Sequence, residues 1–287
     1  MFELRKTDLP SRGIFYPATA ETVTIRPFGI EELMDVSSAI ETKTDAPLIK
    51  AVSKCTNIVD PITYGDFYFI LACIRVLTYT KLPIQWNYVC RSTRLTITFN
   101  ENADETGMDL FAKRFNFKQV SENVFTRANL STEESSAVID HLRVDMPNSY
   151  TGTFGYCNTA NKSTVDVDLL ISNIVRLSDS VDENSVPKGM RVPTVDTLAE
   201  YKSLYSDVKL RKLLPLVACI GSGTLAHTIS NLRQTSESVS LLEIAAEFNA
   251  KIQHGIANKL MCRACTECGA RTDEQQFVIS AESFFQK

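Results

Sequence analysis

The most constraining feature of the sequence is a segment whose helix would be apolar on nearly every side. After Thr63, apolar residues recur every three to four positions: Phe67, Ile70, Leu71, Ile74 and Leu77. Thr63 and Asp66 have the spacing of a capping box, with Asp in place of the usual Glu or Gln. A helix that is apolar around most of its circumference is normally buried. The segment therefore predicts the centre of an N-terminal helical unit.

Shorter elements are expected before this helix. Residues 21–26 alternate polar and apolar side chains, which is typical of a half-buried strand. Helical spacing of apolar residues predicts a helix within 31–40, and Asp45, ahead of Pro47, predicts the start of a second one. We therefore expect one strand followed by two amphipathic helices.

Two further alternating stretches follow the apolar helix. Residues 84–90 and 95–99 both alternate with the period of a strand, and Arg91, Ser92 and Thr93 separate them. This arrangement predicts a β-hairpin with Cys90 next to its tip.

The rest of the chain reads as a polar region followed by a helical one. Residues 100–160 look irregular apart from one short helix, which Ser131 and Glu134 would cap. Helical spacing returns from Ser163 to Leu177, and a further helix is expected near Thr194. Ser240 and Glu243 predict the start of a long helix that leads to a cluster of cysteines.

These patterns together predict an α+β chain that is mainly helical, with small β-hairpins and a C-terminal zinc-ribbon-like knuckle. The expected organisation has three parts. They are residues 1–99 (strand, helical unit and hairpin), 100–160 (an insertion or small module) and 161–287 (a helical region ending in the cysteine knuckle).

The cysteine cluster is the clearest candidate for a metal site. Cys262, Cys265 and Cys268 form two overlapping C-x-x-C steps, and Gly269 completes the form of a zinc knuckle. Glycine permits the positive φ that turns the backbone around a metal ion. Residues 275–279 can form the short strand that usually follows such a turn.

A complete tetrahedral site needs a fourth ligand from elsewhere in the chain. Cys90 is the best candidate because hairpin tips commonly carry ribbon ligands, and Cys157 and His254 are weaker ones. A closed thiolate site would hold a structural zinc ion, since it leaves no open position for substrate. The favoured expectation is nevertheless a metal-free turn with Cys90 too distant to help.

The other cysteines are expected to be ordinary core residues. Cys55, Cys73 and Cys219 lie among apolar neighbours and are interpreted as small buried hydrophobic side chains. The first eight residues lack the apolar core of a secretion signal, so a disulfide framework is not expected. No apolar run is long enough for a membrane anchor.

Charge and motifs argue against two broad classes of function. With 30 basic and 34 acidic residues the net charge is −4, which gives no support to nucleic-acid or membrane-surface binding and favours protein partners. Known catalytic motifs were not found. His141, His227 and His254 are isolated in the sequence and are each predicted to be dispensable. The chain is therefore expected not to be an enzyme.

An apolar segment near the N-terminus is expected to dock on a surface. Residues 9–17 contain Leu9, Ile14, Phe15 and Tyr16 within a stretch bounded by prolines. The segment is too apolar for a free tail, so we expect it to lie against the protein's own helices or against a neighbouring protein.

Several of these features occur in an order that resembles one family, the T-even-type phage baseplate hub subunits. The residues that carry the resemblance are Leu9–Pro17, Val23, Ile25, Pro27, Glu31–Glu32, Gly65–Asp66, Arg75, Trp86, Tyr88, Cys90, Cys265, Cys268, Gly269 and Phe284–Phe285. The resemblance covers residues 9–99 and 240–287 and leaves the middle of the chain unassigned. In one departure, the hairpin carries a lone Cys90 where a C-x-x-C pair would complete a four-thiolate site.

The resemblance implies a structural or assembly component of the baseplate hub of a contractile phage tail. Its partners would be other hub and tail proteins, with self-association left open. It would act in the virion baseplate and in the host cytoplasm during assembly. Two alternatives remain from the residues themselves: a zinc-ribbon regulator that binds nucleic acid or polymerase, which would need a basic face, and a tail-associated hydrolase, which would need a carboxylate-lined cleft.

Overall fold

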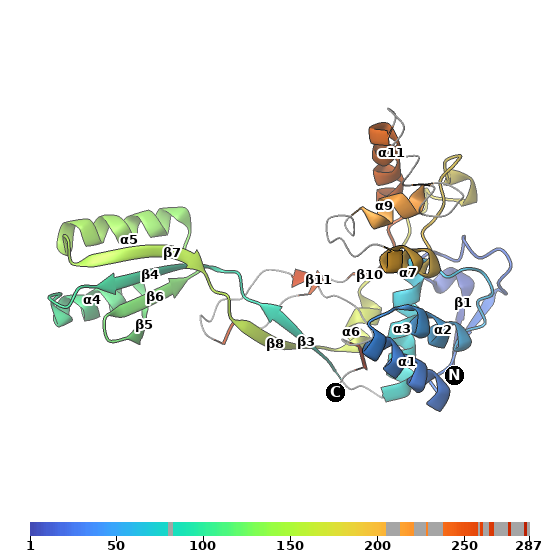
Figure 1. Ribbon diagram of the computed structural model, residues 1–287, viewed down its shortest axis with the longest axis horizontal. Helices are drawn as coiled ribbons and strands as arrows, with labels where there is room; N and C mark the ends of the chain where they lie inside the picture. Colours follow the sequence, from blue (N-terminus) through green and yellow to red (C-terminus); the bar gives the residue numbers. More distant parts are fainter. Residues whose placement is uncertain are drawn as a thin grey trace. The chain divides into compact units, whose positions relative to one another are not determined.

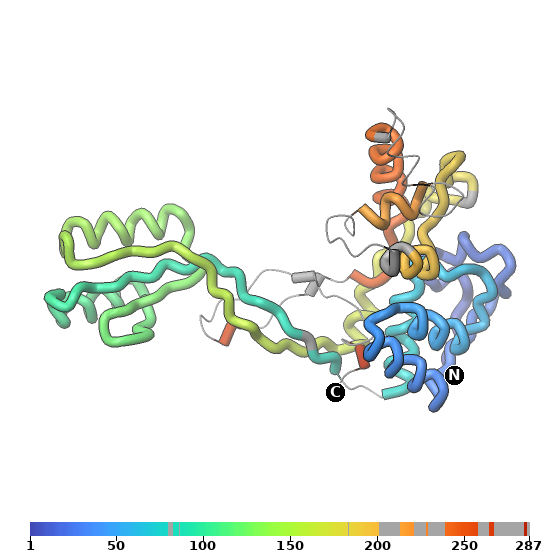
Figure 2. Tube along the Cα trace, viewed as in Figure 1, coloured from blue at the N-terminus to red at the C-terminus, as the bar shows by residue number. Residues whose placement is uncertain are grey.

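The computed structural model describes residues 1–79, 83–204, 213–220, 228, 238–257, 259–260, 264–266, 275–276 and 284–285. The contacts within the chain divide it into two compact units. Unit 1 comprises Met1–Gln85, Thr164–Asn258 and Val278–Lys287, and unit 2 comprises Trp86–Ser163 and Lys259–Phe277. The N-terminal segment and the segment Thr164–Asn258 therefore build one unit together, as the blue and the yellow-to-orange parts of Figure 2 show.

Unit 1 is built mostly from helices (Figure 1). They are α1 (Ile30–Thr42), α2 (Ala46–Lys54), α3 (Tyr64–Tyr79), α6 (Val167–Ser172), α7 (Val195–Leu204), α9 (Leu214–Cys219) and α11 (Ser238–Lys251). Short 3-10 helices occur at Lys6–Asp8 and Glu183–Ser185. Two small antiparallel pairs complete the unit, β1 (Phe2–Arg5) with β2 (Thr22–Ile25) and β9 (Ile174–Val175) with β10 (Gly255–Ile256).

Helix α3 lies at the centre of unit 1, as its sequence predicts. Ile70, Leu71 and Ile74 are fully buried, and the helix contacts α2, α6, α7, β2 and β10. The predicted capping pair is also present, since the Asp66 amide donates to Thr63 Oγ1. A helix covered from so many directions has no polar face, which explains its sequence.

Unit 2 contains a four-stranded antiparallel sheet in the order β5-β6-β4-β7. Its strands are β4 (Thr93–Phe99), β5 (Lys118–Ser121), β6 (Val124–Ala128) and β7 (Tyr150–Tyr156), and its helices are α4 (Glu105–Phe115) and α5 (Thr132–Asp145). Elsewhere β3 (Ile84–Val89) pairs with β8 (Ala160–Val165), and β11 (Lys259–Leu260) pairs with β12 (Gln275–Gln276).

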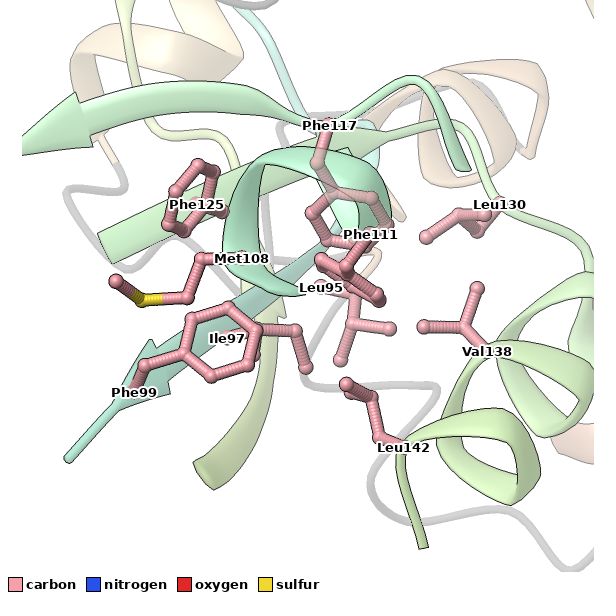
Figure 3. Close-up of a cluster of buried hydrophobic side chains, with 10 residues drawn as sticks. All are labelled: Leu95, Ile97, Phe99, Met108, Phe111, Phe117, Phe125, Leu130, Val138 and Leu142. Atoms are coloured by element: carbon pink, nitrogen blue, oxygen red, sulfur yellow. The ribbon is translucent and has the colours of Figure 1, made fainter. Parts of the chain in front are cut away.

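One face of this sheet is covered by both helices. The core between them is shown in Figure 3 and consists of Leu95, Ile97, Phe99, Met108, Phe111, Phe117, Phe125, Leu130, Val138 and Leu142. Leu95, Ile97 and Phe99 alternate along β4 and therefore point to the same face. The predicted cap of α5 is confirmed, because the Glu134 amide donates to Ser131 Oγ and the Ser131 amide to the Glu134 carboxylate.

The predicted hairpin is wrong, although both of its strands exist. β3 pairs with β8, and β4 lies between β6 and β7. The alternation of residues 84–99 reveals strands but not their partners, and the partners of β4 are supplied by residues that looked irregular. Residues 100–160 in fact contain helices α4 and α5 and strands β5, β6 and β7.

The predicted fold class is corrected accordingly. The described part of the chain is 45% helical and 23% strand, a mixed composition and not a mainly helical one. The helix expected from Ser163 to Leu177 is also shorter, because α6 spans Val167–Ser172 between strands β8 and β9. Among the described helices, none has the length and apolar character needed to cross a bilayer.

Candidate metal centre

Three cysteines that are remote in the sequence meet inside unit 2. Cys90, Cys157 and Cys265 are all buried, and their sulfur atoms all lie within 4.8 Å of one another. The Sγ atoms of Cys157 and Cys265 are 3.8 Å apart. Two thiolates on one tetrahedral ion, each about 2.3 Å from it, are separated by about 3.8 Å. The cluster therefore has the dimensions of a metal site and can hold a metal ion.

Strand pairing positions Cys90 and Cys157. Cys90 directly follows β3 and Cys157 directly follows β7. The Cys90 amide donates to Thr159 O and the Cys157 amide donates to Ser92 O, both at 3.0 Å. Both cysteines are thus held by the main chain where the paired strands pass from one sheet to the next.

Asn161 positions the third cysteine. Its Oδ1 accepts from the amide and the hydroxyl of Thr266, both at 3.0 Å. Its Nδ2 lies 3.4 Å from Cys265 Sγ and 2.9 Å from Thr159 O. Asn161 is itself buried. One amide side chain therefore ties the C-terminal segment to β8 and donates to the sulfur.

Each sulfur has a polar neighbour that can stabilise a thiolate. Ser92 Oγ lies 3.0 Å from Cys90 Sγ, and Thr159 Oγ1 lies 3.3 Å from Cys157 Sγ. With Asn161 at Cys265, these groups supply one donor for each sulfur. Hydrogen bonds to the charged form favour it, and outer groups of this kind orient metal ligands.

The sequence interpretation identified part of this cluster. Cys90 and Cys265 come together, so the expectation that Cys90 lies too far from the knuckle is wrong. Cys157, considered a weaker candidate, completes the described cluster, while Cys262 and Cys268 lie outside the described residues. A signal for Cys157 did exist, because Cys90 and Cys157 both precede a hydroxyl residue by two positions after an alternating stretch.

His254 belongs to a different polar network, in unit 1. Its Nε2 lies 2.8 Å from Thr63 Oγ1, and its Nδ1 lies 2.6 Å from Ile252 O. Since a carbonyl can only accept, Nδ1 carries a proton. The interpretation of His254 as isolated is therefore wrong in space, although it is correct along the sequence.

The centre of this network is the fully buried carboxylate of Asp66. It accepts from the Ser11 amide at 2.9 Å, from the Tyr16 hydroxyl at 2.7 Å and from the Thr63 hydroxyl at 3.1 Å. Burial, followed by the nearby Asp66 charge, raises the pKa of Tyr16 well above its usual range, so Tyr16 remains a hydrogen-bond donor. The network explains how a charge can be buried at the start of α3.

The same network confirms the docking of residues 9–17 on the protein's own helices. Leu9 and Tyr16 are fully buried, and Ser11 and Tyr16 both bond to Asp66 in α3. We refer to residues 9–17 as the N-terminal strap. The strap lies inside unit 1 as part of its core.

The remaining histidines and cysteines have local explanations. His141 Nδ1 lies 2.8 Å from Asp145 Oδ2, one turn along α5, and His227 lies outside the described residues. Cys55, Cys73 and Cys219 are buried, as predicted. Burial raises the pKa of Cys55 to about 11 and those of Cys73 and Cys219 to about 12, so all three remain neutral thiols.

Comparison with known proteins adds no relatives. No protein family model matches the chain, and neither the curated proteins nor the solved structures contain a significant match to it.

Proposed function

We propose that this chain is a structural or assembly component of the baseplate hub of a contractile phage tail, and that it is not an enzyme. Its partners would be other hub and tail proteins. It would act in the tail baseplate after assembly in the host cytoplasm. The observation that carries the proposal is the order of the motifs that resemble hub subunits, together with the structural roles of Tyr16, Asp66, Cys90, Phe284 and Phe285, which lie among the described residues.

Those roles are all ones of packing or positioning. The strap residue Tyr16 bonds to Asp66, and Cys90 lies in the thiol cluster. Phe284 and Phe285 are buried, and the ring of Phe285 lies 5.4 Å from that of Phe28. Motif residues that hold segments together are what a scaffold protein requires, whereas an enzyme exposes some of its polar residues to substrate.

An arrangement with catalytic residue types occurs among the described residues of unit 1, and it does not support an active site. Thr63, His254 and Asp66 lie near one another, but Thr63 and Asp66 are at most 1% exposed, so their oxygens are closed to substrate. His254 Nδ1 faces a carbonyl, where a catalytic triad needs a carboxylate.

The hydrolase alternative receives little support from the pocket on unit 2. This pocket has a volume of about 390 Å³, and Asp140 supplies its single carboxylate. Arg143 Nη1 lies 3.3 Å from that carboxylate. A carboxylate already paired with an arginine is a poor general base, and a second one is needed for glycoside hydrolysis.

We further propose that the thiol cluster holds a structural zinc ion. Zinc favours tetrahedral sulfur ligands, and a closed thiolate site has a structural role. Cys262 or Cys268 is the natural source of a fourth thiolate, since each lies three residues from Cys265. Elemental analysis of the purified protein tests this: about one zinc per chain is expected, with loss of the metal in Cys157→Ser or Cys265→Ser. Metal-free wild-type protein purified without chelator would refute the zinc proposal.

Depletion of the protein during phage infection tests the hub function. The expected result is loss of baseplates in electron micrographs, with heads still formed. Mass spectrometry of purified virions then separates the two forms of the proposal: stoichiometric presence marks a hub subunit, and presence only in infected-cell lysate marks an assembly factor. Normal baseplates accompanied by altered transcript levels would favour the zinc-ribbon regulator instead.

A further inference from the structure

The two edges of the sheet in unit 2 differ in how well they are protected. Edge strand β5 (Lys118–Ser121) is short, carries Lys118 and has an irregular register between Gln119 and Ser121. Such features discourage pairing with another chain. Edge strand β7 (Tyr150–Tyr156) is seven residues long, pairs regularly with β4 and contains neither a charged residue nor a proline.

The outer edge of β7 carries unused hydrogen-bonding positions within the described residues. The Cys157 amide donates to Ser92 O, and the Asn100 amide donates to Ser149 O. In an antiparallel pair, alternate residues direct their N–H and C=O groups at the partner strand. The odd-numbered residues of β7 therefore bond to β4, and the even-numbered residues direct these groups away from the sheet.

Two of the exposed side chains of β7 are large aromatic ones. Phe154 is 68% exposed and Tyr156 is 65% exposed. Both lie on the face that the helices cover, because β4 residues of the core are their neighbours in register. On the same face Gly152 is already packed closely by its own chain, since a Cβ added there would lie 3.2 Å from Ile139 Cδ1 and 3.4 Å from Ile97 Cδ1.

The sequence of β7 is complementary to itself in the antiparallel direction. A two-fold axis at Thr153 would place Thr153 opposite its own copy, Phe154 opposite Gly152, and Tyr156 opposite Tyr150. This register pairs even-numbered residues with even-numbered ones, as the outward-facing groups require. Each Phe154 would lie opposite a glycine, which has no side chain to clash with its ring, and the Thr–Thr and Tyr–Tyr pairs are favourable across strands.

We propose that β7 is a self-association edge, on which β7 of a second copy of this chain pairs antiparallel about Thr153. The proposed occupant is a second copy of the chain for three reasons. In this register Phe154 lies opposite Gly152, residues with outward-facing N–H and C=O groups lie opposite one another, and neither strand carries a charge. The two sheets become one continuous sheet across the axis. Phe154 of each copy lies opposite Gly152 of the other and beside the Ile139 side chain that packs over it, which removes part of the Phe154 ring from water.

A pair of opposite charges at the two-fold axis tests the register. Sedimentation velocity of the full chain over a wide concentration range should show a dimer for the wild type. Thr153→Lys and Thr153→Asp each place like charges opposite one another and should raise the dimer dissociation constant roughly tenfold or more. An equimolar mixture of the two variants should restore the dimer. Gln119→Lys, an exposed change on β5, is the matched control and should leave the dimer unchanged.

Hydrogen exchange provides a second readout that does not depend on these variants. The amides of Gly152 and Phe154 should exchange more slowly in the dimer than in dilute monomer, while the Thr153 amide, already bonded to β4, should change little. A wild type that is monomeric at every concentration would overturn the proposal. So would a dimer that persists in Thr153→Lys, or variants that fail to pair with each other.

Discussion

The two units hold remote segments together with different chemistry. In unit 1, the carboxylate of Asp66 collects hydrogen bonds from Ser11, Tyr16 and Thr63, and Thr63 contacts His254. In unit 2, three sulfur atoms gather at one point. Strong donors meet strong acceptors in the first network, whereas thiols are weak hydrogen-bonding groups.

The hydrogen-bond network around Asp66 therefore needs no added ligand, whereas the thiol cluster of unit 2 would be stabilised by a bound metal ion. Asp66 has its hydrogen-bond partners within the chain, and a buried carboxylate with such partners is stable without further help. Three neighbouring thiols gain little from one another, but three thiolates can bind a cation tightly. The comparison leads us to expect that metal affects unit 2 and that substitutions around Asp66 affect unit 1.

The largest expected effect is that of metal removal. If the proposed zinc ion is bound, its chelation should destabilise unit 2 by several kcal/mol, because metal binding energy becomes folding energy when the ligands come from separate segments. Hydrogen-exchange mass spectrometry should show faster exchange in Trp86–Ser163 and unchanged exchange in Met1–Gln85. Cys219→Ala, which removes a buried thiol from unit 1, should leave the zinc content unchanged. Equal loosening of both units on chelation would contradict the comparison.

The second largest effect is expected from Asp66→Asn. The variant replaces one acceptor oxygen with a donor that faces the hydroxyls of Tyr16 and Thr63, so it should lower the free energy of unfolding by about 3 kcal/mol. Chemical denaturation measures this value. Asp179→Asn is the control, because its side chain is 97% exposed and its pair with Arg12 contributes little. If Asp66→Asn lowered the free energy of unfolding by less than Asp179→Asn does, the network around Asp66 would not be what holds the strap in place.

The local structure of much of the fold could be predicted because it depends on neighbouring residues. The capping pairs Thr63–Asp66 and Ser131–Glu134 mark helices α3 and α5, and the alternation of residues 84–90 and 95–99 marks strands β3 and β4. Each cap involves residues three positions apart, so nothing distant is needed to form it.

The partners of β4 and the composition of the thiol cluster could not be predicted, because they depend on residues that are far apart. Cys157 and Cys265 are separated by 108 positions, and Thr63 and His254 by 191. Alternation predicts that residues 95–99 form a strand but does not identify β6 and β7 as its neighbours. The hydroxyl residues that follow Cys90 and Cys157 likewise do not show which other sulfurs these cysteines will meet.

A smaller effect is expected where two glycines allow backbones to touch in unit 1. Gly255 has a φ of +119°, and a Cβ added to it would lie 2.7 Å from Gly65 Cα in α3. Gly255→Ala should therefore cost about 2 kcal/mol through strain and separation of the two segments. Gly189→Ala is the matched control, with a φ of +83° but open space around its Cβ, and should cost about 1 kcal/mol. Thermal denaturation of both variants measures the contribution of the contact between Gly255 and Gly65. Equal losses of stability in the two variants would show that this contact is unimportant.

The smallest effect concerns acid stability. Hydrogen bonds from Arg26, together with one from the Gly29 amide, lower the pKa of Glu32 to about 2 from 4.5. Because the folded-state pKa is the lower one, the stabilisation is present above pH 4.5 and is lost as the pH falls toward 2. Glu32→Gln should cost about 1 kcal/mol at neutral pH, discounted for the exposure of Arg26. Denaturation at several pH values should show this loss shrinking in acid, whereas Glu31→Gln should show a weaker dependence on pH.

The contact between Thr63 and His254 also sets an order for biosynthesis. Thr63 emerges from the ribosome long before His254, which follows 191 residues later in the chain. During that interval the nascent chain emerges with all four strands of the β5-β6-β4-β7 sheet and both of its helices, so this part of unit 2 can fold while α3 still lacks β10 and the contact with His254. Translation thus completes the first-made unit last, and a chain truncated before His254 leaves part of the apolar helix α3 open to the cell's proteases and chaperones.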